Sequence, residues 1–198
     1  MTNEHNVLGI PIFVRLDSLL TMTPVLPSIA GRQRSSTHET AKHPAMLLPY
    51  DGIFLTIIVD KNGGLYVRTQ KEENKLYVMQ PRWAAVATLF PQDSILFAIL
   101  YTSSNGMLVF GIYDIVREQG TELLNHPLLE RHAKVQQYIR NNQPHAEISA
   151  HWVGYEAACM KINRTKNDLP FRVKYTVRLG ENKYTPVLQL DTGLMCDC

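Results

Sequence analysis

The sequence feature that most constrains the fold is a predicted hairpin near residue 60. Its first strand is predicted from Pro49 to Val59, and the run Ile53 to Val59 is so apolar that we expect it to be buried on both faces. The following segment contains Asn62-Gly63, which supplies the positive φ angles that a tight turn requires. The returning strand is Leu65 to Arg68. The chain is therefore predicted to be built around a buried β-hairpin.

Short apolar runs bounded by turn signals predict several further strands. They are Leu76 to Met79, Ile95 to Tyr101, Met107 to Val116, Glu147 to Val153, Ala157 to Ile162 and Phe171 to Leu179. Helical signals are found in two places: a short helix within Arg82 to Phe90, and the longest helix from Pro127 to Arg140. These elements predict an α+β fold with mixed, mostly antiparallel sheets and few helices.

The first 44 residues differ from the rest of the chain. Val7 to Leu20 is predicted to be extended, and Thr21 to Pro44 is a polar, proline-containing stretch that we interpret as a loop. We therefore divide the chain into an N-terminal extended segment and loop (1–44) and one domain (45–198). With 198 residues, 45% of them hydrophobic, the chain can bury one core and is short for two.

Charge and cysteine content limit the classes of function. The formal net charge is +2, so any attraction to nucleic acid must come from a local basic surface, such as one face of the Phe171 to Leu179 strand. The spacing of Cys159, Cys196 and Cys198 is not that of a metal-binding pair, and reduced thiols favour an intracellular protein. No apolar run approaches the ~20 residues of a membrane-spanning helix. We expect a soluble protein of the cytoplasm or nucleus that does not bind membranes.

Several short elements occur in an order that is typical of one enzyme superfamily. They are Pro49-Tyr50-Asp51-Gly52, Phe97-Ala98-Ile99, Phe110-Gly111-Ile112-Tyr113-Asp114, Pro127-Leu128-Leu129-Glu130-Arg131, Glu156-Ala157-Ala158-Cys159-Met160-Lys161 and Arg172-Val173-Lys174. Together they resemble the covalent nucleotidyltransferases, that is, the ATP-dependent polynucleotide ligases and mRNA-capping guanylyltransferases. The resemblance covers most of the chain and implies a nucleotidyltransferase-like core. The few residues after Lys174 lead us to expect no OB domain.

Four positions depart from the pattern of that superfamily, one of them Ala157, which stands in place of a glycine. Pro49 stands where the resemblance implies the nucleophilic lysine, and proline has no amine that can attack a phosphate. Phe54 replaces an arginine, and Ile99 replaces a glutamate that would bind the ribose. We therefore expect no catalytic residue and a pseudoenzyme. The alternative is an active, divergent guanylyltransferase or ligase that uses another lysine, such as Lys42, or a partner chain.

The resemblance also implies which residues could still bind a ligand. A nucleotide, with or without Mg²⁺, or RNA phosphate would contact Asp51, Lys161, Arg172 and Lys174, with Glu156 as a weak metal candidate. Bases could stack on Tyr50, Trp152 or Tyr155. This predicts an RNA- or capped-RNA-binding module, or a scaffold, within an assembly of other protein subunits. There are two simpler interpretations. Either the charged side chains named above form only solvated surface, or the chain is a structural subunit whose pocket is filled by Phe97 and Ile99.

Overall fold

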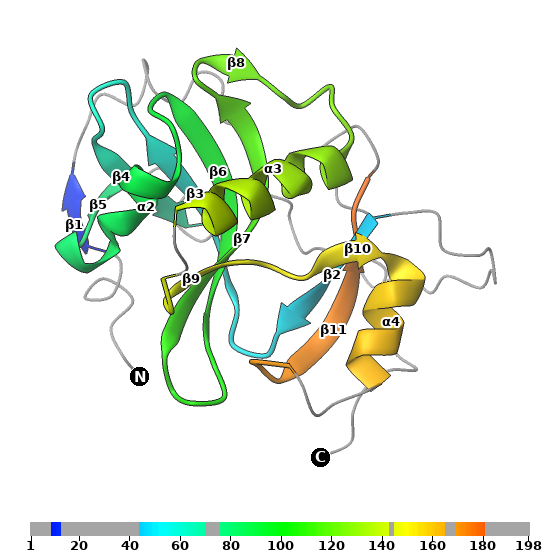
Figure 1. Ribbon diagram of the computed structural model, residues 1–198. Helices are drawn as coiled ribbons and strands as arrows, with labels where there is room; N and C mark the ends of the chain where they lie inside the picture. Colours follow the sequence, from blue (N-terminus) through cyan, green and yellow to red (C-terminus); the bar gives the residue numbers. More distant parts are fainter. Residues whose placement is uncertain (1–8, 13–43, 70–75, 143–144, 165–168, 181–198) are drawn as a thin grey trace.

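The computed structural model describes residues 9–12, 44–69, 76–142, 145–164 and 169–180, and within them the chain folds around a large and a small β-sheet (Figure 1). The large sheet comprises β1 (Gly9–Ile12), β3 (Ile53–Val59), β4 (Leu65–Thr69), β5 (Leu76–Met79), β6 (Ser94–Thr102), β7 (Leu108–Glu118), β8 (Thr121–Glu122) and β9 (Ile148–Ala150). Its order is β1-β5-β4-β3-β6-β7-β8, and these neighbours are antiparallel. β9 pairs with β7 in parallel.

The small sheet joins parts of the chain that are distant in sequence. Its central strand β2 (Pro44–Pro49) lies between β10 (Val153–Tyr155) and β11 (Val173–Arg178), and both pairings are antiparallel. The helix α4 (Glu156–Arg164) packs against this sheet, while α3 (Leu128–Asn141) packs against β7 of the large one. The α+β prediction with mostly antiparallel strands is confirmed. Among the described residues, no helix is long and apolar enough to cross a membrane.

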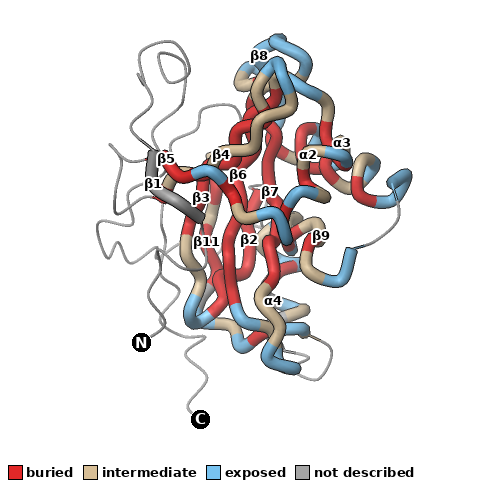
Figure 2. The backbone as a smooth tube through the Cα atoms, turned by 90° about the vertical axis from the view of Figure 1, so that its left-hand side faces the viewer, coloured by how far each residue is buried: buried red, intermediate tan, exposed pale blue. Residues whose placement is uncertain are grey.

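Strand β6 shows how the core is divided between the two faces of the large sheet. Because side chains alternate along a strand, Leu96, Ala98 and Leu100 enter one apolar cluster with Trp83, Phe110 and Val135. Phe97, Ile99 and Tyr101 enter the other cluster, together with Met46, Leu48 and Phe171 of the small-sheet region. The buried residues accordingly run through the middle of the molecule (Figure 2). Burial on both faces, which was predicted for the first strand of the hairpin, is confirmed for β3.

The helices agree with the sequence in most respects. The predicted long helix is α3, which begins directly after Pro127. The short one is a 3-10 turn, η2 (Pro81–Trp83), followed by α2 (Ala85–Leu89). Within the predicted extended stretch 7–20, only β1 is described. Lys42, Cys196 and Cys198 lie outside the described residues.

Three predicted strands were wrong in extent or type. Pro49 and Val59 do not share a strand, because β2 ends at Pro49 and β3 begins at Ile53 in the other sheet. The run 147–153 is divided between β9 and β10. The segment 157–162 is helical in α4, not a strand. Its Ala, Met and Lys residues favour a helix, and Cys159 and Ile162, three positions apart, turn the same helix face towards the core.

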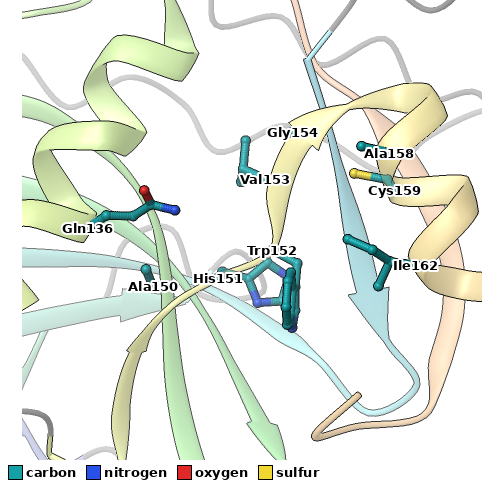
Figure 3. Close-up of a pocket in the computed structure, with 9 residues that line it drawn as sticks. All are labelled: Gln136, Ala150, His151, Trp152, Val153, Gly154, Ala158, Cys159 and Ile162. Carbon is teal, nitrogen blue, oxygen red and sulfur yellow. The ribbon is translucent and has the colours of Figure 1, made fainter. Parts of the chain in front are cut away.

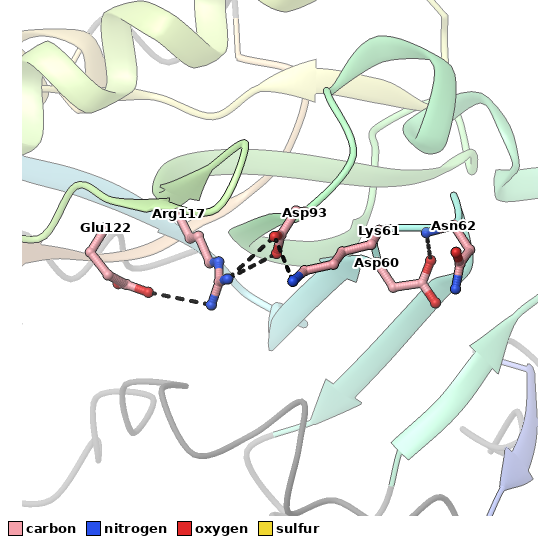
Figure 4. A network of polar contacts seen from close by, with 6 residues as sticks. All are labelled: Asp60, Lys61, Asn62, Asp93, Arg117 and Glu122. Atoms are coloured by element: carbon pink, nitrogen blue, oxygen red, sulfur yellow. Dashed lines mark hydrogen bonds and ion pairs between the residues drawn. The ribbon is translucent and has the colours of Figure 1, made fainter.

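A polar network fixes one end of the large sheet (Figure 4). In the β3–β4 turn, Oδ1 of Asp60 accepts hydrogen bonds from the backbone N–H groups of Asn62 at 2.8 Å and Gly64 at 2.6 Å. The Asp93 carboxylate forms ion pairs with Nη2 of Arg117 at 3.1 Å and with Nζ of Lys61 at 3.8 Å. The first hairpin turn is thereby tied to β7, at the end of β3 opposite to the Asp51-Gly52 pair.

Candidate functional site

The segment Tyr50-Asp51-Gly52 forms the corner at which the chain leaves the small sheet and enters the large one. The turn is closed by a hydrogen bond from the Gly52 N–H to the Pro49 carbonyl oxygen at 3.3 Å. The Tyr50 N–H donates to the Arg172 carbonyl oxygen at 3.0 Å, so the corner is attached to the start of β11. Asp51 and Tyr50 are exposed, whereas Pro49 is buried. The corner therefore presents two side chains to solvent while its base is held by β11.

The interior behind this corner is filled by apolar side chains. Phe97, Ile99 and Tyr113 are 0% exposed and Phe54 is 4% exposed. The Tyr113 ring stacks on Phe97 at 6.2 Å between centroids and meets Phe54 edge-on at 6.3 Å. Ile99 contacts the corner itself, since a Cβ on Gly52 would lie 2.8 Å from its Cγ2 atom. The described residues thus form an apolar interior at the place where the resemblance implies a nucleotide. This interior does not fit a nucleotide held between the two sheets.

Two predicted cationic residues meet one predicted aromatic residue on the surface of this corner. The Arg172 guanidinium carbon lies 5.3 Å from the centroid of the Tyr50 ring, and Nζ of Lys174 lies 5.6 Å from it. Tyr50 is 56% exposed, and both cations are exposed as well. We call Tyr50, Arg172 and Lys174 the corner cluster. Within the described part of the chain, it is the one place where a predicted stacking residue lies within cation–π distance of predicted phosphate-binding residues.

Helix α4 carries two other predicted site residues, Glu156 and Lys161. Lys161 is exposed on α4 and so does not stand on a strand beside β11. Glu156, the metal candidate, forms an ion pair with Arg178 of β11, in which Oε2 accepts from Nε at 3.0 Å and from Nη2 at 2.5 Å. Among the described residues, no group of three or more His, Cys, Asp or Glu side chains could hold a metal ion. In this arrangement the Glu156 carboxylate is held by Arg178.

The other two predicted stacking residues lie at the edge of the small sheet. Tyr155 is 53% exposed at the end of β10, and Trp152, directly before β10, is 41% exposed. Both are large aromatic side chains in contact with solvent. The cation–π contacts found among the described residues involve Trp83 and Tyr50, and neither Trp152 nor Tyr155.

No role was predicted for three buried polar residues that the fold engages, Asp114, Arg131 and His151. Nε of Arg131 on α3 lies 2.9 Å from Oδ1 of Asp114 on β7, and both side chains are nearly inaccessible. Burial raises the pKa of Asp114 to about 7, although the Arg131 guanidinium acts in the opposite direction. His151 donates from Nε2 to the Leu47 carbonyl oxygen at 2.6 Å, and burial lowers its pKa to about 4. Both Asp114 and Arg131 stood in the quoted elements, but only the tertiary fold shows that they pair.

These features define an α+β domain whose fold is similar to that of solved DNA-ligase domains. Two solved structures are similar to it: the ligase domain of LigD from M. tuberculosis, and a mycobacterial DNA ligase D that is complexed with ATP and MES. Each has a TM-score of 0.56 and 16% sequence identity, and the match covers 83% of this chain and 57% of that chain. This chain thus spans little more than half of either. No family model and no curated protein matches the sequence.

Proposed function

We propose that this domain is a non-catalytic relative of the ligase and capping-enzyme domains and that it binds RNA through the corner cluster, as a module of a larger assembly. The observation that carries the proposal is the meeting of Tyr50, Arg172 and Lys174 at the Asp51-Gly52 corner. In the family that the chain resembles, this corner is where the nucleotide becomes attached. The proposed site thus has the same position as the nucleotide site of that family, but its ligand lies on the surface and not in the interior.

The absence of catalysis is inferred from two features of the corner. Pro49 supplies no amine, so no lysyl-nucleotide can form at that residue. Ile99 and Phe97 are fully buried in the apolar cluster behind it, and neither can hydrogen-bond to a ribose. Incubation of the chain with labelled ATP or GTP and Mg²⁺, followed by denaturing electrophoresis, tests this inference. A retained covalent label would favour the alternative, an active and divergent nucleotidyltransferase.

RNA is the ligand that best suits the chemistry of the corner cluster. An exposed aromatic ring offers a stacking surface worth about 1 to 3 kcal/mol per base, and neighbouring cations attract the phosphates on either side of that base. Because all three side chains are exposed, they suit a strand that lies across the surface better than a small molecule that must be enclosed. Capped RNA is included in this class of ligand.

The test is a salt titration of binding to a single-stranded RNA, with wild-type protein and with the double variant Arg172→Ala/Lys174→Ala. Each phosphate contact on a single strand contributes about −0.7 to the slope of log K against log salt concentration. The double variant should therefore flatten the slope by roughly one to two units. The matched control is Lys61→Ala/Arg82→Ala, which also removes two exposed cations, neither of them in the corner cluster.

The result expected is a flatter slope for the corner variant and an unchanged slope for the control. Tyr50→Leu should weaken binding with little effect on the slope, because it removes a stacking surface and no charge. Equal slopes for wild type and the corner variant would reject the corner cluster as an RNA site, and the scaffold interpretation would then be preferred.

A further inference from the structure

A cavity of about 340 Å³ opens between α3 and α4, away from the corner cluster (Figure 3). Its lining includes Gln136 of α3, Trp152 and Val153 at the start of β10, and Ala158, Cys159 and Ile162 of α4. Tyr50, Arg172 and Lys174 are not part of this lining. Neither are the apolar residues Phe97 and Ile99 that fill the interior behind the corner. The cavity is thus a separate site from the one considered above.

The lining is mainly apolar and, among the residues described there, contains no Asp, Glu, Lys or Arg. His151 also borders it, but burial lowers the pKa of His151 to about 4, so its ring is neutral at pH 7. A phosphate or carboxylate placed inside would lose its hydration without gaining a countercharge. The chemistry of the walls therefore selects a neutral ligand.

Gln136 supplies the cavity with a polar group of defined orientation. Nδ1 of His132 donates to the Tyr113 carbonyl oxygen at 3.0 Å, which leaves Nε2 of His132 as an acceptor for the Gln136 amide at 3.3 Å. The Gln136 carbonyl accepts from Nη2 of Arg140 at 3.2 Å. An amide has two N–H donors and two lone pairs on its oxygen. One donor and one acceptor thus remain beyond these contacts, and Figure 3 shows the amide directed from α3 towards the other lining residues.

We propose that this cavity binds a neutral, planar heteroaromatic ring of the nucleobase class, with Gln136 as its hydrogen-bonding partner. A side-chain amide that offers a donor and an acceptor together is complementary to the edge of adenine, which presents the same pair. The Trp152 indole and the aliphatic side chains of α4 provide apolar contact for the ring. The volume exceeds that of a single base and lies within the range of small-molecule sites. This inference does not depend on the corner cluster.

Binding is measured by isothermal titration with adenosine, guanosine and cytidine, and by the fluorescence of Trp152. Trp83 is fully buried in the core, so a change of emission on titration is expected to come from Trp152. Toluene serves as a planar, apolar probe that has neither a hydrogen-bond donor nor an acceptor. A single-stranded oligoadenylate distinguishes a base within RNA from a free nucleoside as the source of the ring. The result expected is saturable binding of adenosine or of the oligoadenylate, and weaker binding of the apolar probe.

Two pairs of variants locate the site. Gln136→Leu should weaken binding roughly three- to tenfold, which corresponds to one neutral hydrogen-bonding group. Gln137→Leu, on an exposed position of the same helix that does not line the cavity, should change it less than about twofold. Ala158→Phe should fill the cavity and abolish binding, whereas Ala157→Phe, its exposed neighbour outside the lining, should not. Far-UV circular dichroism and thermal unfolding confirm that each variant is folded.

Three outcomes would overturn the proposal: no saturable binding of any nucleoside or of the oligoadenylate, equal binding of the apolar probe, or equal effects of each variant and its matched control. If Ala158→Phe does not fold, the comparison of Gln136→Leu with Gln137→Leu tests the proposal by itself. Arg172→Ala/Lys174→Ala should leave the affinity for adenosine unchanged. A loss of RNA binding at the corner with retained adenosine binding, or the reverse, therefore separates the two proposals.

Discussion

Ile99 packs directly against Gly52, at the corner between the two sheets. A Cβ on Gly52 would lie 2.8 Å from Cγ2 of Ile99 and 3.3 Å from the carbonyl oxygen of Pro49. Since Ile99 is fully buried, it has little room to withdraw. Gly52→Ala should therefore lower the free energy of unfolding by about 1 to 3 kcal/mol, as measured by urea denaturation.

The control for that substitution is Gly154→Ala, because a Cβ there would meet only the Cβ of Ala158 at 4.0 Å. It should change stability by less than about 0.5 kcal/mol. A double-mutant cycle of Gly52→Ala with Ile99→Ala should give a coupling energy of about 0.5 kcal/mol or more, since the second change removes the clashing methyl group. Strictly additive effects would show that Ile99 is not the obstacle.

Restoring the nucleophile alone should not restore nucleotidylation. In Pro49→Lys, the new amine would still face an interior in which Phe54 and Ile99 offer no partner to phosphate or ribose. We expect no covalent label after incubation with labelled ATP or GTP and Mg²⁺. Mass-spectrometric detection of a nucleotide on the introduced lysine would contradict this expectation and would place a nucleotide-binding space behind the corner.

Glu156 should act as a structural ion-pair partner and not as a metal ligand. Removal of its carboxylate in Glu156→Ala leaves Arg178, whose side chain is 21% exposed, without this acceptor. The expected loss is about 1 to 2 kcal/mol in the free energy of unfolding. Glu130→Ala is the matched control, because Glu130 also lies in the first turn of a helix but its side chain is 66% exposed. It should cost less than about 0.5 kcal/mol. Mg²⁺ should stabilise wild type and Glu156→Ala equally in thermal unfolding.

His151 should make the fold sensitive to acid. Its pKa is lowered from 6.5 to about 4, so the unfolded chain binds a proton at this residue more readily than the folded one does. The stability that neutral His151 contributes is complete above pH 6.5 and is lost as the pH falls towards 4, by about 3 kcal/mol in total. Asp114 acts in the opposite direction. Its pKa is raised from 3.8 to about 7, so the folded chain binds a proton at this residue more readily than the unfolded one does. The free energy of unfolding therefore falls as the pH rises from about 4 to 7.

The two effects are separated by comparing wild type with His151→Phe, which keeps a ring beside Phe171. Phe cannot donate to the Leu47 carbonyl oxygen, so this variant should be less stable at pH 7, yet the acid-induced loss between pH 6.5 and 4 should be smaller than in wild type. Urea denaturation at several pH values measures both. An unchanged dependence on pH would mean that His151 titrates normally.

The sequence predicted those parts of the fold whose signals are local. The turn around Gly63, the apolar arms on either side of it and the start of α3 after Pro127 are each encoded by neighbouring residues. The segment 157–162 was misread because six residues of mixed apolar character are compatible with a strand or with two turns of a helix. The break after Pro49 was missed because β2 and β3 are both apolar and follow one another almost without interruption.

The candidate site was predicted only in its components. Tyr50, Arg172 and Lys174 were each selected from the sequence, but their meeting depends on the pairing of β2 with β11, which no local pattern encodes. The burial of Phe97 and Ile99 agrees with the expectation that apolar replacements fill the interior. Gln136 was not selected at all, because one glutamine on an amphipathic helix carries no distinguishing pattern. Its relation to His132 and to the cavity depends on the packing of α3.

The order of strands in the small sheet also bears on how the chain folds as it is synthesised. Met46 of β2 pairs with Val153 of β10 and with Val177 of β11, which both leave the ribosome more than a hundred residues later. In the hairpins β3–β4 and β6–β7, by contrast, each strand pairs with the next strand along the chain. The large sheet from β3 to β8 can therefore form early, while both edges of β2 are still unpaired. An apolar strand in that condition is prone to aggregation, so expression of a chain truncated before β10 should yield mainly insoluble protein.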